Sequence, residues 1–163
     1  VVSEFDISNN LALPFFKKHS RFSFLRTKSL SQNARNSISE LGIVCQSEVD
    51  PVTTLSGGNQ QKVMVGRWLA EESSVLLLDE PFQGVDIKAR RDIGIQIRST
   101  SSQRATLIFV AELDEALEIA DRVIVLHEGN LVGEYQNKSE NVPEIVSSFS
   151  GSIYKQDSSN YGI

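Results

Sequence analysis

Short, continuous apolar runs alternate with helix-like patterns through the last two thirds of the sequence, and this alternation limits the possible folds most. The runs are Val75–Leu78, Thr106–Val110 and Val123–Leu126. The first has the composition of a strand that is buried on both faces, and the second also reads as a buried strand. Between the runs, residues 86–98 and 113–120 carry apolar side chains at helical spacing. Strands that alternate with helices predict an α/β fold with a mainly parallel sheet flanked by helices.

The first part of the chain, residues 1–54, differs from the rest in composition and is expected to form a separate N-terminal part that contains helices. It is rich in Ser, Asn, Phe and Lys. One helix is expected with Ser31 as its N-cap and Gly42 near its end, and an earlier one is expected to start near Ser8. The stretch Lys17 to Lys28 is expected to be a loop.

The rest of the chain is expected to form a core part at residues 55–146, followed by a polar tail at 147–163. Within the core part, the sequence His127-Glu128-Gly129-Asn130 predicts a hairpin turn that leads into a further strand. The tail is expected to be mobile, because terminal polar segments usually are.

Charge and cysteine content exclude some classes of protein. The formal net charge is −5 and the basic residues are scattered, which argues against a nucleic-acid partner. Cys45 is the only cysteine, so the chain has no internal disulfide and a reducing compartment is expected. No apolar run approaches the roughly 20 residues that a membrane-spanning helix needs.

The segment Leu55–Lys62, with the sequence LSGGNQQK, is the first of three that carry chemistry. Two glycines at the start of a helix expected over Asn59–Ala70 let the backbone approach an anion, which the free N–H groups and the helix dipole then hold. The Ser56 hydroxyl adds a donor. Taken alone, Ser-Gly-Gly is better read as an ordinary turn before a helix.

The other two segments lie at the end of the first strand and just beyond it. Asp79 and Glu80 are adjacent carboxylates at the strand's C-terminal end, where α/β sheets place ligands. Asp79 could hold Mg²⁺ through water, and Glu80 could orient or deprotonate an attacking water. Gly84-Val85-Asp86 follows and, by itself, is only an N-cap for the next helix.

In this order, the three segments resemble the signature loop, the Walker B strand and the D-loop of ATP-binding-cassette (ABC) ATPases. The resemblance is strong over Thr54–Tyr135 and weaker over residues 1–53, which are similar to that family's helical subdomain. It implies the C-terminal half of a P-loop NTPase-type ABC domain. The NQQK extension resembles that of ATPases driving import of ribose, galactose and xylose. Those proteins usually carry two ABC domains in tandem, and this chain looks more like the second.

The resemblance also implies roles, cofactors and partners. Glu80 would be catalytic, Asp79 would hold Mg²⁺, and Asp86 would belong to the D-loop. The signature residues would contact ATP bound by a second ABC domain; these are Ser56, Gly57, Gly58 and Gln60. Membrane permease subunits would be direct partners, and a periplasmic or extracellular binding protein an indirect one. The intact protein would be an ATP hydrolase lying peripherally on the cytoplasmic face of the membrane.

The sequence departs from the family pattern at three places. Ala111 stands where the family has its switch histidine, and a methyl group can neither contact a γ-phosphate nor move a proton. This argues against efficient hydrolysis at the domain's own site, although in the sugar-importer group the second domain often lacks this histidine. Phe82 stands where Thr is more usual, and we interpret it as local packing. No Gly-x-x-x-x-Gly-Lys-Ser/Thr loop occurs, so the isolated chain is expected to be inactive.

Two other functions fit part of the pattern. A soluble ABC ATPase, such as a translation factor or a DNA-repair ATPase, shares the three motifs, but Asn59-Gln60-Gln61 speaks against it. A regulatory ABC domain that supplies only the signature is favoured by Ala111 and opposed by the intact Glu80.

Overall fold

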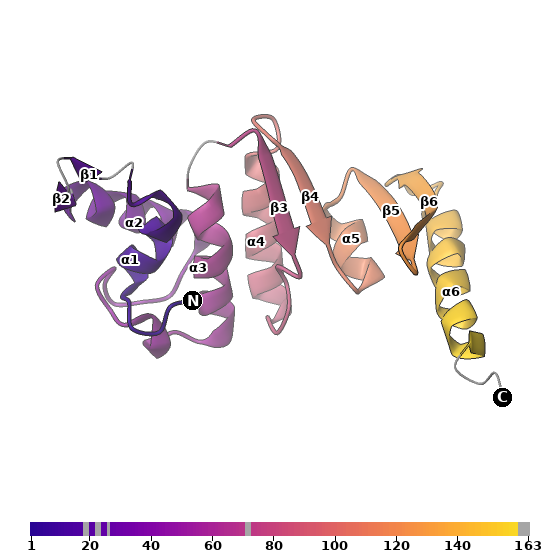
Figure 1. Cartoon of the computed structure of the whole chain (residues 1–163), viewed down its shortest axis with the longest axis horizontal. Coiled ribbons are helices and arrows are strands. Elements are labelled where there is room, and N and C mark those ends of the chain that lie inside the picture. The colour runs from indigo at the N-terminus through magenta and orange to yellow at the C-terminus, as the bar shows by residue number, and fades with distance from the viewer. Residues whose placement is uncertain (18–19, 22–23, 26, 71–72, 160–163) are drawn as a thin grey trace. The chain divides into compact units, whose positions relative to one another are not determined.

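The structure is a computed structural model that describes residues 1–17, 20–21, 24–25, 27–70 and 73–159. The chain divides into two compact units, Val1–Phe109 and Val110–Ile163. Each unit has its own elements, which are labelled in Figure 1. Among the described residues, no helix combines the length and the apolar character that crossing a membrane requires.

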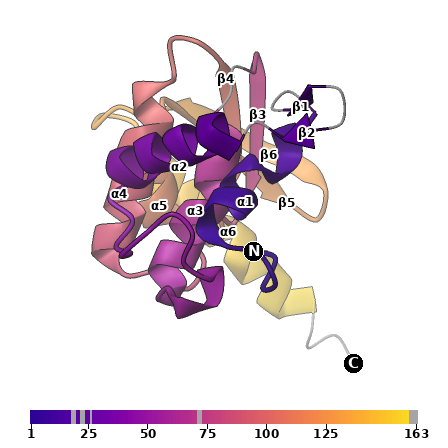
Figure 2. The ribbon, with the colours of Figure 1, turned by 90° about the vertical axis from the view of Figure 1, so that its left-hand side faces the viewer.

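The first unit contains four α-helices, two 3-10 helices and four strands among its described residues. The helices are α1 (Ile7–Ala12), α2 (Thr27–Leu41), α3 (Gly57–Leu69) and α4 (Ile87–Ser99), with η1 (Leu13–Phe15) and η2 (Val52–Thr54). The strands are β1 (Ser20–Arg21), β2 (Phe24–Leu25), β3 (Val75–Asp79) and β4 (Ala105–Phe109). In both views α3 lies beside α1 and α4 (Figure 1, Figure 2), in agreement with the contacts between these helices.

Side-chain caps explain where three of these helices begin. Asp6, Ser56 and Asp86 precede α1, α3 and α4, and each accepts a hydrogen bond from the backbone N–H three residues later. Such a bond satisfies one of the N–H groups that a helix leaves unpaired at its start. The predicted helices near Ser8, after Gly57-Gly58 and after Asp86 are therefore confirmed.

The predicted start of α2 is wrong, whereas its predicted end is confirmed. The helix begins at Thr27, four residues before Ser31, whose hydroxyl instead donates to Glu48 Oε1 at 2.6 Å. At the other end Gly42 has φ +57, and the Ile43 N–H donates to the Ile38 carbonyl at 2.9 Å. A residue without a Cβ is favoured at this left-handed position, which closes the helix with a Schellman-type pattern.

The loop predicted over Lys17–Lys28 is only partly correct. Ser20–Arg21 and Phe24–Leu25 pair as a short antiparallel ladder, and α2 starts at Thr27. Residues 18, 19, 22, 23 and 26 lie outside the described part, so the prediction is not assessed there.

The helices of the first unit enclose an apolar cluster that joins its N-terminal segments to α3. Ile7, Val52 and Val63 are fully buried in it. Its other buried members are Leu11, Ala34, Leu41, Ile43 and Leu55. Burying this much apolar surface is the main force that holds α1, α2 and α3 together.

Strands β3 and β4 form a parallel pair, as predicted, but β3 is not buried on both faces. Leu76 and Leu78 are 5% and 6% exposed, whereas Val75 and Leu77 are 60% and 65% exposed. On β4, Leu107 and Phe109 are 43% and 45% exposed. An apolar strand is buried on both faces only where other segments cover both of them, and no described residue of the first unit covers the second face of β3.

The second unit contains α5 (Leu113–Ile119), β5 (Arg122–His127), β6 (Asn130–Gln136) and α6 (Val142–Ser159). The predicted hairpin is confirmed: β5 and β6 pair antiparallel, with Glu128 at φ 47 and Gly129 at φ 76 in the turn. Two successive left-handed residues match the twist of the strands they join. Val123, Val125 and Ile145 form the core, against which the apolar face of α5 packs.

One further expectation stays open and one is corrected. Helix α6 extends through Ser159, and Ile145, near its start, is fully buried; that the tail from Ser147 is mobile stays a prediction. The sheet is not mainly parallel, because the described strands form three two-stranded sheets of which only β3–β4 is parallel. The division of the chain at residues 54 and 146 stays a prediction.

Candidate functional site

The first turn of α3 presents its start to solvent. Ser56 and Gly57 are exposed, and a Cβ built on Gly57 would have no other atom within 4 Å. A Cβ on Gly58 would lie 3.2 Å from the Ala89 Cβ of α4, so Gly58 allows close approach of the two helices. Gly57 therefore leaves room for a ligand beside the helix start, whereas Gly58 has a packing role.

Hydrogen bonds from consecutive side chains hold this turn in place. Gln60 Nε2 donates to the Leu55 carbonyl at 3.0 Å, which fixes the residue just before the cap. Gln61 Nε2 donates to the Pro81 carbonyl at 2.9 Å, in the turn that follows β3. The start of α3 is thus tied to the segment that carries Asp79 and Glu80.

The next residue along α3, Lys62, also ties this helix to its neighbours, through a buried ammonium group. Lys62 Nζ lies 2.6 Å from Asp92 Oδ2 of α4 and donates to the Gly42 carbonyl at 3.0 Å. Its side chain is 6% exposed, and a buried charge is tolerated only when it is paired and hydrogen-bonded in this way. Lys62 therefore joins the end of α2, α3 and α4.

Asp79 and Glu80 stand at the C-terminal end of β3, as predicted. Asp79 is exposed and Glu80 half-buried. The Glu80 N–H donates to the Phe109 carbonyl at 2.9 Å, and the Glu80 carbonyl accepts from the Gln83 N–H at 3.2 Å.

The backbone of Glu80 is strained. Its φ is +46, a left-handed conformation that costs a residue with a Cβ roughly 1–2 kcal/mol. Glu128 also has a positive φ, but it lies in a hairpin turn whose geometry requires it. Strain of this kind is characteristic of functional positions.

The D-loop candidate and Phe82 occupy the connection between β3 and α4. Gly84 has φ +70, and Asp86 caps α4 by accepting from the Ala89 N–H at 2.8 Å. Phe82 is 3% exposed, which confirms its interpretation as a packing residue. This connection also supplies the Pro81 carbonyl that Gln61 binds.

The structure brings the candidate residues of the first compact unit into one region. Ser56, Gly58, Asp86 and Glu80 are linked through the α3–α4 contact and the Gln61–Pro81 bond. Ala111 is exposed and belongs to the second compact unit. The roles assigned to these residues stay predictions.

Sequence reasoning missed the residues that hold the region together. The sequence predicts Asn59, Gln61 and Lys62 only as parts of the LSGGNQQK run, and it predicts no role for Asp92. The available signal was the polar face of α3: a lysine that becomes buried needs an acidic partner, and Asp92 lies on the facing helix.

The described residues fit a Mg²⁺ ion that is held mainly by a nucleotide. No group of three or more His, Cys, Asp or Glu side chains in the described part of the chain could hold a metal ion by itself. Protein-bound Mg²⁺ commonly takes one or two carboxylates, several waters and substrate phosphates. The exposed carboxylate of Asp79 is suited to that arrangement.

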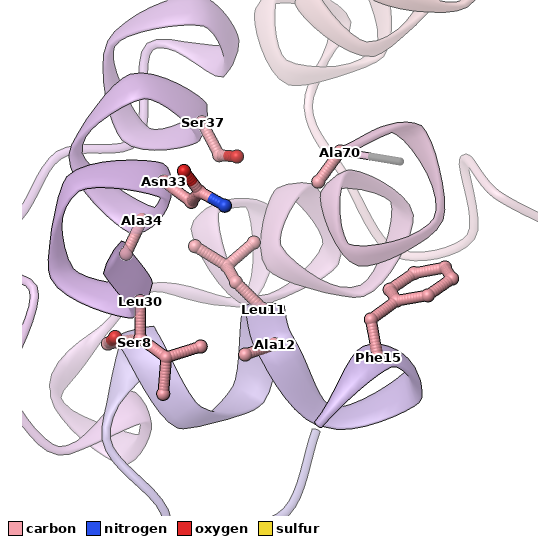
Figure 3. Close-up of a pocket in the computed structure, with 9 residues that line it drawn as sticks. All are labelled: Ser8, Leu11, Ala12, Phe15, Leu30, Asn33, Ala34, Ser37 and Ala70. Atoms are coloured by element: carbon pink, nitrogen blue, oxygen red, sulfur yellow. The ribbon is translucent and has the colours of Figure 1, made fainter. Parts of the chain in front are cut away.

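A hollow between α1, α2 and the end of α3 does not belong to this region (Figure 3). It is lined largely by apolar side chains, among them Leu11, Phe15 and Leu30, with Ser8, Asn33 and Ser37 as polar members. No charged residue and none of the motif residues line it, so it offers nothing to a phosphate group.

Comparison with known proteins gives the family. Residues 4–83 match the ABC transporter family model, a range that includes LSGGNQQK and the strand with Asp79 and Glu80. Residues 4–83 are therefore part of an ABC transporter ATP-binding domain.

The curated proteins that match this chain include sugar import proteins. Over 152 residues the chain is 35% identical to the ribose import ATP-binding protein RbsA 2 of Rubrobacter xylanophilus. This match covers 93% of this chain and 29% of that protein. It is also 35% identical over 136 residues to the xylose import ATP-binding protein XylG of Thermoanaerobacter pseudethanolicus, covering 83% and 27%. The chain therefore spans less than a third of these relatives' length.

Solved structures confirm an ABC cassette-like α/β fold. The dimeric post-hydrolysis structure of the ATP-binding cassette MJ0796, bound to ADP and Pi, matches with a TM-score of 0.71 at 19% identity, covering 85% of this chain and 60% of that one. The cassette MJ1267 gives the same TM-score at 20% identity and covers 91% and 64%. At this identity the likeness concerns the fold alone.

Proposed function

We propose that this chain is part of the ATP-hydrolysing subunit of a bacterial sugar-type ABC importer, from the C-terminal half of its second ABC domain. The observation that carries the proposal is the 35% identity to a ribose import ATP-binding protein along 93% of the chain. The intact subunit would couple ATP binding and hydrolysis to transport. It would lie on the cytoplasmic face of the membrane against permease subunits, which a binding protein supplies with substrate.

Under this proposal the chain contributes residues to two ATP sites. Ser56, Gly57, Gly58 and Gln60 face ATP held by the other ABC domain. The exposed Ser56 hydroxyl, the open space beside Gly57 and the free N–H groups of α3 suit a phosphate group there.

Asp79 and Glu80 serve the chain's own site. Glu80 would orient or deprotonate the attacking water, and the capped Asp86 turn would lie between the two sites as the D-loop. Asp79 would hold Mg²⁺ through water, and the ion would neutralise charge on the phosphates. With Ala111 in place of a histidine, the chain's own site lacks one group that could contact the γ-phosphate.

A regulatory domain that supplies only the signature is the second candidate, and Ala111 is the observation that favours it. It differs from the main proposal in whether Glu80 contributes to hydrolysis. The import functions of the relatives speak against a soluble, non-transport ABC ATPase.

The test is steady-state ATP hydrolysis by the full-length transporter after reconstitution, with Ser56→Arg and Glu80→Gln introduced separately. Ser56→Arg places bulk and a misplaced charge where phosphate must dock, so most ATPase activity and transport should disappear. Glu80→Gln removes a general base worth about 10²–10⁴ in rate where it is used. Because Ala111 weakens the same site, total turnover should fall only modestly.

Ser39→Arg is the matched control, because Ser39 is exposed on α2 and lies outside the motifs. It should leave turnover unchanged. Normal turnover with Ser56→Arg, together with a collapse in Glu80→Gln, would reverse the assignment of the two sites. If Glu80→Gln has no effect at all, the regulatory alternative is favoured.

A further inference from the structure

Asn59 makes two hydrogen bonds with its side chain, one at each end of the amide. Its Nδ2 donates to Ser56 Oγ at 3.0 Å, and its Oδ1 accepts from the Val44 N–H at 3.1 Å. The Val44 bond determines which end of the amide faces Ser56, because a backbone N–H can only donate. Asn59 therefore presents an N–H group, and not an oxygen, to the serine hydroxyl.

The hydroxyl of Ser56 consequently has its acceptor positions filled. Besides Asn59 Nδ2, the backbone N–H of Asn59 donates to Ser56 Oγ at 3.4 Å, as the N-cap of α3. A serine hydroxyl can accept two hydrogen bonds and donate one. Since both bonds to Asn59 are accepted ones, only the O–H donor is left for another partner.

We propose that Asn59 is a positioning residue that keeps the Ser56 hydroxyl as a hydrogen-bond donor toward the nucleotide phosphate. The inference rests on the proposed function, which places Ser56 against ATP bound by the other ABC domain. An O–H that is already directed outward need not reorient when the phosphate arrives, so its bond is available in the transition state. The Val44 backbone, from the segment after α2, is the fixed point that sets the amide.

The stability of α3 alone does not require an asparagine at position 59. Asn59 is the third residue of α3, within the first turn, where an acidic side chain interacts favourably with the helix dipole. Aspartate would therefore suit the helix at least as well as asparagine. It would accept the Ser56 proton, however, and so turn the hydroxyl away from a phosphate.

This difference provides the test, in the full-length transporter after reconstitution. Asn59→Asp should leave thermal unfolding unchanged or slightly raised, yet lower kcat for ATP hydrolysis about tenfold or more, since a charge-assisted bond is lost and a negative charge is added. Asn59→Leu, which has a similar shape and no donor, should lower kcat about fivefold. The matched control is Asn36→Leu on the exposed surface of α2, which should leave kcat unchanged.

A double-mutant cycle with Ser56→Ala separates positioning from a general structural role. If Asn59 acts through the hydroxyl, Asn59→Leu should cause no further loss of kcat in the Ser56→Ala background. An equal loss in both backgrounds, or normal kcat in Asn59→Asp, would overturn the inference. If Asn59→Leu prevents assembly, Asn59→Asp alone decides, because its helix remains favoured.

The outcome for Ser56→Arg distinguishes this inference from the proposed function. If Ser56→Arg abolishes turnover but the Asn59 effects are independent of Ser56, only the inference fails. Normal turnover in Ser56→Arg would remove the proposed function, and the inference with it.

Discussion

The start of α3 and the end of β3 lie in the same compact unit, yet they are held in different ways. At the start of α3, Asn59 binds the segment after α2, and Gln61 binds the turn after β3. Lys62 binds both the end of α2 and α4. All of these partners belong to the first unit. Along β3, by contrast, alternate apolar side chains are exposed, with Leu77 at 65% and Val75 at 60%.

This difference indicates which of the two candidate segments, the start of α3 or the end of β3, the chain can hold in place by itself. The start of α3 is fixed by bonds that the chain makes internally. The strand that carries Asp79 and Glu80 leaves one apolar face open, and the chain covers 60% of the cassette MJ0796 that it resembles. We expect the rest of the full-length protein to cover that face.

The largest expected effect concerns the two faces of β3. In this chain Leu78→Ala should lower the free energy of unfolding by about 2–5 kcal/mol, because Leu78 is buried and a cavity would remain. Leu77→Ala, the same substitution one residue away, should cost less than about 0.5 kcal/mol, as exposed substitutions do. Urea unfolding measures both. Equal losses would show that the second face of β3 is covered within this chain.

The next effect concerns the buried lysine. Lys62→Met keeps the length of the side chain but leaves Asp92 and the Gly42 carbonyl without their partner, so unfolding free energy should fall by about 2–3 kcal/mol. Adding Asp92→Leu should recover part of the loss, because no unpaired charge then remains. Lys88→Met, at an exposed position of α4, serves as the control. If the two lysine variants are equally stable, Lys62 does not anchor α3.

A smaller effect is expected from the strain at Glu80. Glu80→Gly should raise the unfolding free energy by about 0.5–1 kcal/mol, because glycine adopts the left-handed backbone without the steric cost of a Cβ. Glu80→Ala removes the same carboxylate but keeps the Cβ, so it should give no such gain. Glu128→Gly, at φ 47 in the hairpin, is a matched comparison. A gain at Glu128 without one at Glu80 would mean that the Glu80 turn is not strained.

The smallest effect depends on pH. The hydrogen bond from the Ser31 hydroxyl, assisted by Arg35, lowers the pKa of Glu48 below its ordinary value. A carboxyl with a depressed folded-state pKa stabilises the protein fully above the ordinary glutamate value of about 4.3, and this contribution is lost as the pH falls through the folded-state pKa. Ser31→Ala should raise the Glu48 pKa and flatten the acid dependence of stability. An NMR titration of Glu48 that is the same in both proteins would contradict this.

Local signals in the sequence predicted the elements whose chemistry is local. Gly42 predicted a helix end and Asp86 a helix start, because a left-handed residue and a capping carboxylate act on their immediate neighbours. The motif segments were placed correctly at the start of α3 and the end of β3 for the same reason. The hairpin after His127 belongs to this group as well.

Long-range partners explain what the sequence could not predict. Ser31 is a residue type that often caps helices, but its hydroxyl donates a hydrogen bond to Glu48, 17 residues away, and α2 begins earlier, at Thr27. The apolar run Val75–Leu78 indicates burial only when the covering segments are present. The bonds of Asn59, Gln61 and Lys62 depend on helices meeting in space, and no spacing in the sequence specifies those distances.

The measurement that tests the account most directly is calorimetric titration of Mg-ATP into this 163-residue chain, beside the full-length protein. Under the proposed function this chain carries parts of two ATP sites, and neither site is complete without other segments or the other ABC domain. The chain alone should therefore show no binding in the micromolar range and no ATP hydrolysis, whereas the full-length protein binds. Micromolar binding of Mg-ATP by the isolated chain would contradict the account.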